Sequence, residues 1–360
     1  MVRCNNKTMR NESSARQPYI RLKDIAARAG VSVMTVSLAL RGDSRISRSR
    51  KDEIQGLAKE MGYSANPMLS ALSDYRNALR PERFFETVGL VIAHHAPSLD
   101  RDELSLASNS SAVSEHAGEL GYQLDVFFAG ESPESQSKVA RVLRNRGIRG
   151  VIVDPVYCDI TRIRLPWESL ATVFLWAISK NPEKAPIYSV KSDNFLSAMR
   201  VVGKLSEKGY SRPGLFLTAQ PEEPSTVEWL GGYEVGILRS KMQTHIPPLV
   251  LPGYEAAPFK KWVAKYNPDV IVGTPWIDIP KELNAMGMSV PQDIGYCGLD
   301  VGENFPHVSG IHQNRREVCR IAVDLLSSML RRNAIGVPSS GYSITVDSVW
   351  RDAGTLRSAK

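Results

Sequence analysis

Residues 29–35 read Ala29-Gly30-Val31-Ser32-Val33-Met34-Thr35, and this stretch decides the fold of the N-terminal part of the chain. Gly30 suits the left-handed backbone of a tight turn, and Val31 is placed to enter a core between two helices. The Ser32 hydroxyl can cap the following helix by accepting a backbone N–H. The pattern predicts a helix-turn-helix whose second helix points its N-terminal end into a DNA major groove.

The second helix of this motif has two separable faces when residues are placed at 100° intervals. Its inward face holds Val36, Ala39 and Leu40. Its outward face holds Val33, Met34, Ser37, Leu38 and Arg41. We expect the hydroxyls of Ser32, Thr35 and Ser37 to contact phosphates or base edges, and the apolar side chains to contact thymine methyl groups. The alternative is a buried helix in an ordinary three-helix domain.

Around this motif, residues 20–62 predict three short helices, the third capped by Ser47 and ended by Gly62. The charge of the chain is concentrated in the same region. The first 80 residues hold fifteen Lys and Arg against seven Asp and Glu, whereas the other 280 hold thirty against thirty-one. A basic block on a neutral body indicates a part that binds a polyanion, although a solvated charged arm would have the same composition.

The rest of the chain, from Val88 onward, alternates strand and helix signals. We expect strands at 88–93, 124–129, 150–154, 172–177, 214–218, 269–273 and 294–299. This alternation predicts parallel sheets with helices on both faces, and its length favours two such subdomains. The four cysteines, Cys4, Cys158, Cys297 and Cys319, have no metal-binding or disulfide spacing. Without an apolar leader or a membrane-length apolar run, the sequence predicts a cytoplasmic protein with no membrane partner.

The N-terminal pattern resembles the lactose-repressor (LacI/GalR) family of bacterial regulators. The matching segments are Leu22-Lys23-Asp24-Ile25-Ala26, Ala29-Gly30-Val31-Ser32, Thr35-Val36-Ser37, Arg41-Gly42, Ile46-Ser47, Gly62-Tyr63 and Asn66-Pro67. The resemblance implies that the segment after Asn66-Pro67 folds into a hinge helix on DNA. It also implies that Leu72 wedges into the minor groove and kinks the duplex. Without the resemblance, Leu72 would be read as a linker residue that touches the body.

One departure from the family pattern concerns Leu38, which stands where the family often has an arginine that reads guanine. Loss of a bidentate arginine–guanine contact removes roughly 1–3 kcal/mol of base discrimination, so we expect a different operator base here. Together, the residues expected to contact DNA are Leu22, Ser32, Val33, Met34, Thr35, Ser37, Leu38, Arg41, Ile46, Ser47, Asn66, Leu69 and Leu72.

The resemblance continues more weakly over residues 88–352, and it implies a periplasmic-binding-protein-like body. In that fold two doubly wound α/β lobes, joined by three crossovers, close on a small effector. Asp300 matches the family position whose carboxylate binds effector hydroxyls, although a strand-end turn residue is an equal alternative. Trp176, Trp229 and Thr274 with Trp276 stand where the family has polar ligand-binding groups. These tryptophans could stack on a sugar or another flat ligand, or fill the core. The expected effector residues are His94, Trp176, Trp229, Thr274, Trp276, Asp300 and Gln313.

These patterns predict a chain divided into a basic, disordered tail (1–18), an all-α helix-turn-helix headpiece (19–64), a hinge (65–80) and an α/β body (86–360). We expect the first lobe at about 86–188 and 313–338, and the second at about 189–312 and 339–352. The predicted function is a homodimeric regulator, with repression favoured, that binds pseudo-palindromic operator DNA and a small effector such as a sugar.

No catalytic or metal-binding motif occurs in the sequence, and we expect neither enzyme activity nor a cofactor. His94-His95 could serve a metal or acid–base site, but two ordinary loop histidines are the better reading. The alternatives are a solute-binding protein, or a sugar- or nucleoside-processing enzyme with an appended DNA-binding domain. The first predicts a secretion signal and the second a catalytic carboxylate pair, and neither is evident.

Overall fold

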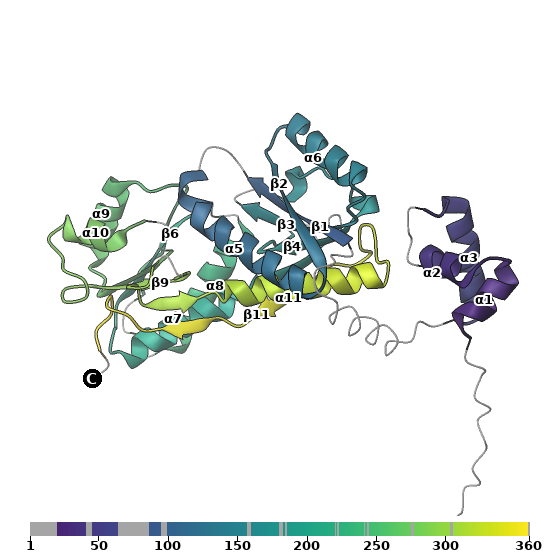
Figure 1. The fold of residues 1–360 in the computed structure, drawn as a ribbon. Coiled ribbons are helices and arrows are strands. Elements are labelled where there is room, and N and C mark those ends of the chain that lie inside the picture. The colour runs from purple at the N-terminus through teal and green to yellow at the C-terminus, as the bar shows by residue number, and fades with distance from the viewer. Residues whose placement is uncertain are drawn as a thin grey trace, which may run out of the picture. The chain divides into compact units, whose positions relative to one another are not determined.

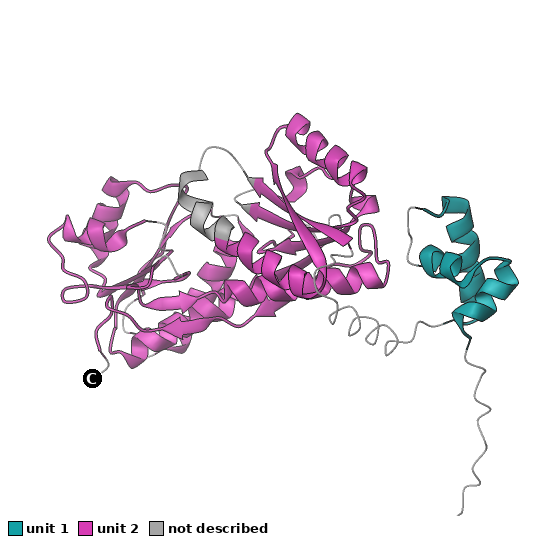
Figure 2. Ribbon diagram, viewed as in Figure 1, with its two compact units in different colours: residues 1–76 teal, residues 77–360 magenta. Residues whose placement is uncertain are grey.

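A computed structural model describes residues 20–40, 45–63, 86–94, 99–156, 160–179, 183, 186–219, 221, 223–240, 242, 245–274, 277–302 and 305–358. The chain divides into two compact units, residues 1–76 and 77–360 (Figure 2). We call them the head and the body. The sequence-predicted tail (1–18) and the whole of the predicted hinge (65–80) lie outside the described residues.

The head is built from three helices, α1 (Leu22–Ala29), α2 (Val33–Leu40) and α3 (Arg48–Glu60), as the sequence predicts (Figure 1). Each helix turns a narrow apolar stripe toward the other two, which is the usual way that small helices bury hydrophobic area. The fully or nearly buried core of the head consists of Ile25, Ala26, Val36, Ala39, Ile54 and Ala58.

The body contains two six-stranded sheets with helices on both faces, which confirms the predicted two-lobed α/β architecture. The first sheet has the order β11-β5-β4-β3-β1-β2. Its strands are β1 (Glu86–His94), β2 (Tyr122–Ala129), β3 (Gly150–Val156), β4 (Ala171–Leu175), β5 (Tyr188–Ser192) and β11 (Tyr342–Val346). Its helices are α5 (Leu99–Glu119), α6 (Pro133–Asn145) and α11 (Arg315–Arg331), and two short 3-10 turns span Ile160–Arg162 and Trp167–Ser169.

Alternation along β1 shows why this sheet is covered on both faces. Leu90 and Ile92 pack with α5 and α11 on one face, whereas Val91 and Ala93 pack with α6 on the other. A central parallel strand therefore reads as a continuous apolar run, as residues 88–93 do.

The second sheet has the order β12-β10-β9-β8-β6-β7, and only the β10–β12 pair is antiparallel among its described pairings. Its strands are β6 (Pro213–Thr218), β7 (Leu249–Leu251), β8 (Val270–Gly273), β9 (Gly295–Gly298), β10 (Gly310–His312) and β12 (Val349–Arg351). Its helices are α7 (Asn194–Glu207), α8 (Pro224–Arg239), α9 (Ala256–Tyr266) and α10 (Ile279–Asn284). Residues of α7 and α8 pack on one face, and residues of α9 and α10 on the other.

The chain passes between the two sheets three times: after β5, after β10 and after β11. The sequence-based lobe limits are wrong in detail, because β5 (188–192) and β11 (342–346) pair with each other in the first sheet. Both strands are short and mix polar with apolar residues, so their sequence did not reveal that they continue the first sheet.

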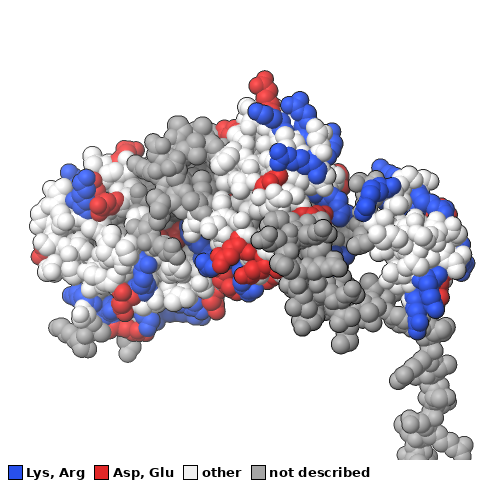
Figure 3. All heavy atoms as spheres, in the orientation of Figure 1, with Lys and Arg blue, Asp and Glu red and all other residues white. Residues whose placement is uncertain are grey.

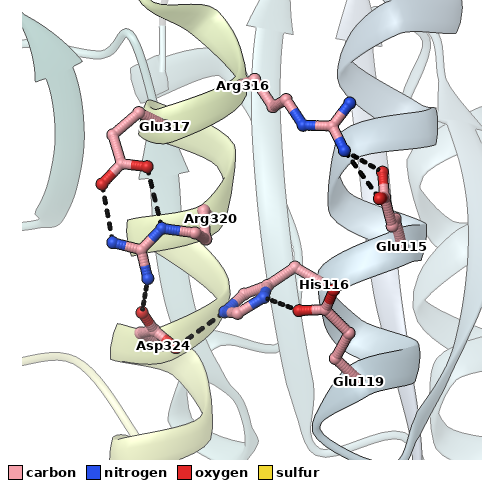
Figure 4. Close-up of polar contacts among 7 residues, drawn as sticks. All are labelled: Glu115, His116, Glu119, Arg316, Glu317, Arg320 and Asp324. Carbon is pink, nitrogen blue, oxygen red and sulfur yellow. Dashed lines mark hydrogen bonds and ion pairs between the residues drawn. The ribbon is translucent and has the colours of Figure 1, made fainter.

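Two helices of the first lobe, α5 and α11, lie side by side and exchange ion pairs (Figure 4). Arg316 pairs with Glu115 at 2.6 Å, and the His116 ring lies between Glu119 and Asp324 at 2.7 and 2.8 Å. These contacts add polar cross-links to an apolar helix contact that already contains Val113 and Ala322.

Candidate DNA-binding face and interlobe site

The turn between α1 and α2 has the geometry that the sequence predicts. Gly30 is left-handed with φ of 65°, and the half-buried Val31 packs against the core of the head. The Ser32 hydroxyl accepts the backbone N–H of Thr35 at 3.1 Å and hydrogen bonds to the Thr35 hydroxyl at 2.9 Å. Ser32 therefore caps α2 and sets the direction in which this helix leaves the turn.

The two faces of α2 also separate as predicted. Val36 and Ala39 are buried, and Leu40 packs against the same core. On the other side Val33 and Met34 are 46% and 61% exposed, which is unusual for apolar side chains of this size. The outward face of α2 is therefore a mainly apolar surface that begins at the N-terminal end of the helix, where a positive helix-dipole end favours phosphate.

The remaining predicted DNA contacts fall into three groups. Thr35, Ser37 and Leu38 are half-buried, and Leu38 does not join the hydrophobic core cluster of the head. Leu22 and Ile46 pack against that core while keeping part of their surface, and Ser47 caps α3 by accepting the N–H of Arg50. Four further positions lie outside the described residues: Arg41, Asn66, Leu69 and Leu72.

Helix α3 holds the ends of the other two helices through polar contacts that the sequence analysis did not single out. The Arg50 guanidinium donates to the Ala29 carbonyl at 2.9 Å, and the Gln55 amide donates to the Ala39 carbonyl at 3.0 Å. Both acceptors are terminal carbonyls that have no partner within their own helix. These bonds fix the angle of α2 in the head, and polar residues on the inward side of α3 were their only sequence signal.

Basic side chains form several separate patches on the visible surface of the head in Figure 3. Arg21, Lys23 and Arg48 are exposed, each beside the first turn of a helix. Such a surface attracts the phosphate backbone of DNA without regard to sequence.

In the body, two of the predicted effector residues, Trp176 and Asp300, meet a third residue, Arg315, between the lobes, and we call this group the interlobe site. Trp176 follows β4 of the first lobe, Asp300 follows β9 of the second, and Arg315 begins α11, which packs on the first sheet. The Arg315 guanidinium donates to the Asp300 carboxylate, and its central carbon lies 5.0 Å from the centre of the Trp176 ring. Ligands of parallel α/β sheets bind beyond the carboxyl ends of the strands, which is where this group lies.

Trp176 has a backbone conformation that bulky residues rarely adopt, with φ of 57°. Its N–H donates to the Val190 carbonyl at 3.0 Å, whereas its buried indole Nε1 has no hydrogen-bond partner among the described residues. Strained backbone at a strand end is a frequent property of functional sites.

Further buried polar groups lie behind Arg315. The Asn109 amide of α5 donates to the Asp154 carboxylate of β3 at 3.1 Å, and both side chains are buried. Burial by itself would lower the pKa of Arg315, but the charges of Asp300 and Asp154 outweigh burial and raise it. Burial and Asp154 raise the pKa of the neighbouring Cys319 thiol to about 12, so that thiol stays protonated. Arg315 is thus a charged group that is hydrogen bonded to Asp300 and further stabilised by the charge of Asp154.

The other predicted effector residues are not all at this site. Trp229 is only 7% exposed and belongs to the core of the second lobe, which favours the alternative that it fills the core. Gln313 donates to the Leu299 carbonyl at 2.9 Å and accepts the Ser192 hydroxyl on its own carbonyl, so it ties two of the crossovers. Thr274 is half-buried after β8. His94 ends β1, but its side chain lies outside the described part, as does Trp276.

Arg315, Asp154 and Asn109 could not be predicted as site residues from the sequence, because none of them stands in a motif. Within the described ranges, no group of His, Cys, Asp and Glu side chains is arranged to hold a metal ion. The described helices also include none with the length and apolar character that crossing a membrane requires.

Comparisons with known proteins match both parts of the chain. A family model described as "Bacterial regulatory proteins, lacI family" matches residues 21–66, and one described as "Periplasmic binding protein-like domain" matches residues 202–352. The maltose regulon regulatory protein MalI of Escherichia coli K12 is 25% identical, over 63% of this chain and 61% of that protein. The transcriptional regulators AscG and IdnR of the same organism are 24% and 23% identical, over 77% and 88% of this chain and 81% and 94% of theirs.

Two solved structures share the fold over nearly the whole chain. The transcriptional regulator CelR–cellobiose complex has a TM-score of 0.58 at 17% identity, covering 93% of this chain and 99% of that one. The Lac repressor dimer bound to operator and an anti-inducer has a TM-score of 0.57 at 18% identity, covering 94% and 100%.

Proposed function

The chain belongs to the lacI family of bacterial regulatory proteins, and we propose on this basis that it is a repressor that binds operator DNA through α2. The observation that carries the proposal is the capped N-terminal end of α2, from which the exposed Val33 and Met34 project. Hydroxyls of Ser32 and Thr35 at that end reach phosphates or base edges, and the apolar side chains contact thymine methyl groups.

The repressor acts as a homodimer on a pseudo-palindromic operator, with half-sites about one helical turn apart. The related Lac repressor, solved as a dimer bound to operator, supports this arrangement. Segment 65–80 is the hinge between head and body, and Leu72 is the residue that wedges into the minor groove. A DNA-binding protein of this kind works in the cytoplasm, where the bacterial chromosome lies.

The body receives a small polar effector, a sugar or a related molecule, at the interlobe site, and lobe closure is coupled to the hinge. Related structures carry cellobiose, glucose and sucrose, and one relative is named a sucrose operon repressor. Asp300 supplies the carboxylate for effector hydroxyls, and Trp176 supplies a flat wall.

Footprinting of the full-length protein on the DNA upstream of its own gene tests the DNA-binding proposal. The expected result is a dyad-symmetric footprint that weakens steeply as salt rises. Val33→Ala should weaken specific binding, whereas Val227→Ala, which truncates a similarly exposed valine of the body, should not. Binding that is only non-specific at physiological salt contradicts the proposal.

A thermal-shift screen of sugars and nucleosides tests the effector site. A compound that raises the melting temperature of the wild type should fail to do so with Asp300→Ala. A compound that shifts both proteins equally binds elsewhere.

A further inference from the structure

The place between Trp176 and Asp300 is filled by a side chain of the protein itself. Arg315 extends from the first turn of α11, with its guanidinium against the Trp176 ring at 5.0 Å and hydrogen bonded to Asp300. Trp176 and α11 belong to the first lobe, and Asp300 follows a strand of the second. One cation therefore joins an aromatic wall of one lobe to a carboxylate of the other.

These two partners are the groups with which proteins bind ligands. An aromatic face and a buried carboxylate together recognise a planar cation, and guanidinium fits both because it stacks and donates in its own plane. Arg315 thus makes, within the chain, contacts of the kind that a bound small molecule makes in a cleft.

The site keeps unused hydrogen-bonding capacity on both sides of Arg315. Asp300 is 9% exposed, and its second oxygen, Oδ1, is buried with no hydrogen-bond partner among the described residues. The buried indole Nε1 of Trp176 also has no hydrogen-bond partner among the described residues. Buried polar atoms are nearly always satisfied, so an orphaned acceptor and an orphaned donor on either side of one guanidinium indicate a site built for more than this arginine.

A second ion pair between the lobes has its cation and its carboxylate on the same sides as the first. Lys191 of β5 lies 2.5 Å from Glu228 of α8, and the other carboxylate oxygen of Glu228 is also buried and has no hydrogen-bond partner in the described part of the chain. In both pairs the first lobe supplies the cation and the second lobe the carboxylate. The contact between the lobes is therefore charge-complementary without any added molecule.

We propose that Arg315 is an internal ligand of the interlobe site, which holds the two lobes together on its own and which an effector displaces from Asp300 when it binds. The inference rests on the proposed function, because it concerns regulation at the same site. Arg315 then competes with the effector for Asp300. An effector must offer Asp300 a hydrogen-bond donor to replace the one that it removes.

Chemical rescue of the full-length protein tests the internal ligand. Arg315→Ala should lower the melting temperature by at least about 5 °C, because it leaves Asp300 buried without its cation. Millimolar methylguanidinium, which reproduces the lost group, should raise the melting temperature of Arg315→Ala saturably and leave the wild type unchanged. Arg320→Ala, which removes an exposed ion-paired arginine of the same helix, should show no rescue.

The reciprocal experiment covers the case in which Arg315→Ala does not fold. Asp300→Ala removes the carboxylate, and acetate should then raise the melting temperature of this variant but not that of the wild type. Folded variants that show neither rescue, or equal shifts in every variant including Arg320→Ala, overturn the inference. Operator binding is measured separately. If the wild-type protein shows no specific DNA binding, that result contradicts the proposed function but leaves the rescue experiment and its outcome unaffected.

Discussion

Lys191 of β5 and Glu228 of α8 form an ion pair of 2.5 Å between the two lobes, although they stand far apart in the sequence. The Lys191 side chain is 9% exposed and that of Glu228 is 27% exposed. Two charges removed this far from water are stable only as a pair, so either partner alone is costly. The stability of the contact between the two lobes therefore depends on the presence of both residues.

A double-mutant cycle measures this dependence. Lys191→Met and Glu228→Gln should each lower the free energy of unfolding by about 2–4 kcal/mol, and the double variant should lose less than the sum. Urea unfolding of the four proteins gives the coupling energy. The same cycle at the exposed pair Lys204–Glu207 serves as the control, with a coupling of at most about 0.5 kcal/mol. Additive losses at Lys191 and Glu228 would show that they do not act as a pair.

The cap of α2 predicts a loss of both stability and operator affinity. Ser32→Ala removes the acceptor of the Thr35 N–H and should destabilise the head by about 1 kcal/mol. Because Ser32 also lies directly before the outward face and is itself an expected DNA contact, specific binding should fall more than non-specific binding in a gel-shift titration. Ser49→Ala changes an exposed serine of α3 and should alter neither property.

Substitution of Leu38 should change the base preference of the protein at one operator position. Leu38→Arg places a guanidinium on the outward face of α2, and selection from randomised operators should enrich a G·C pair by about 1–3 kcal/mol. Ala27→Arg adds the same charge at an exposed position of α1, so it should strengthen binding without changing the selected sequence. An unchanged operator for Leu38→Arg would place this residue away from the bases.

His116 predicts a pH dependence of stability. Its ring bridges α5 and α11 between Glu119 and Asp324, with Arg320 bonded to Asp324 from the other side (Figure 4). Burial lowers the pKa of His116, but the hydrogen bonds to Asp324 and Glu119 outweigh it, and the net shift is upward from 6.5. The stabilising contribution is complete below the unfolded-state pKa and is lost as pH rises through the folded-state value.

Melting temperatures between pH 5 and pH 9 check this prediction, because they span the range in which an imidazole of raised pKa titrates. His116→Gln should remove part of the decline in stability on the alkaline side, and Asp324→Asn should do the same by removing one partner. His307→Gln, at an exposed loop position, should keep the wild-type profile. A profile of His116→Gln identical to that of the wild type would contradict the bridge.

Most of the head could be predicted because its determinants are local. A left-handed glycine, a capping serine and a period of 3.6 residues act within a few positions of each other, and Gly30, Ser32 and Val36 all lie as expected. The longer or more apolar strands of the body (β1, β2, β3, β4, β6, β8 and β9) were predicted for a similar reason, since parallel strands inside a covered sheet are apolar runs, whereas the three-residue strands β7, β10 and β12 were not predicted. Strands β5 and β11 were placed in the wrong lobe, because pairing between distant segments leaves little trace in short, mixed sequences.

The sequence by itself determined the helix-turn-helix, the alternating α/β body and the family. Each of these depends on short-range patterns of backbone preference and hydrophobic periodicity. Only the tertiary structure decided which polar residues form the interlobe site. Trp229 went to the core, whereas Arg315 came to lie between Trp176 and Asp300. Arg315 carries no motif, and its role arises because the crossover after β10 starts α11 opposite the end of β9, which no local pattern encodes.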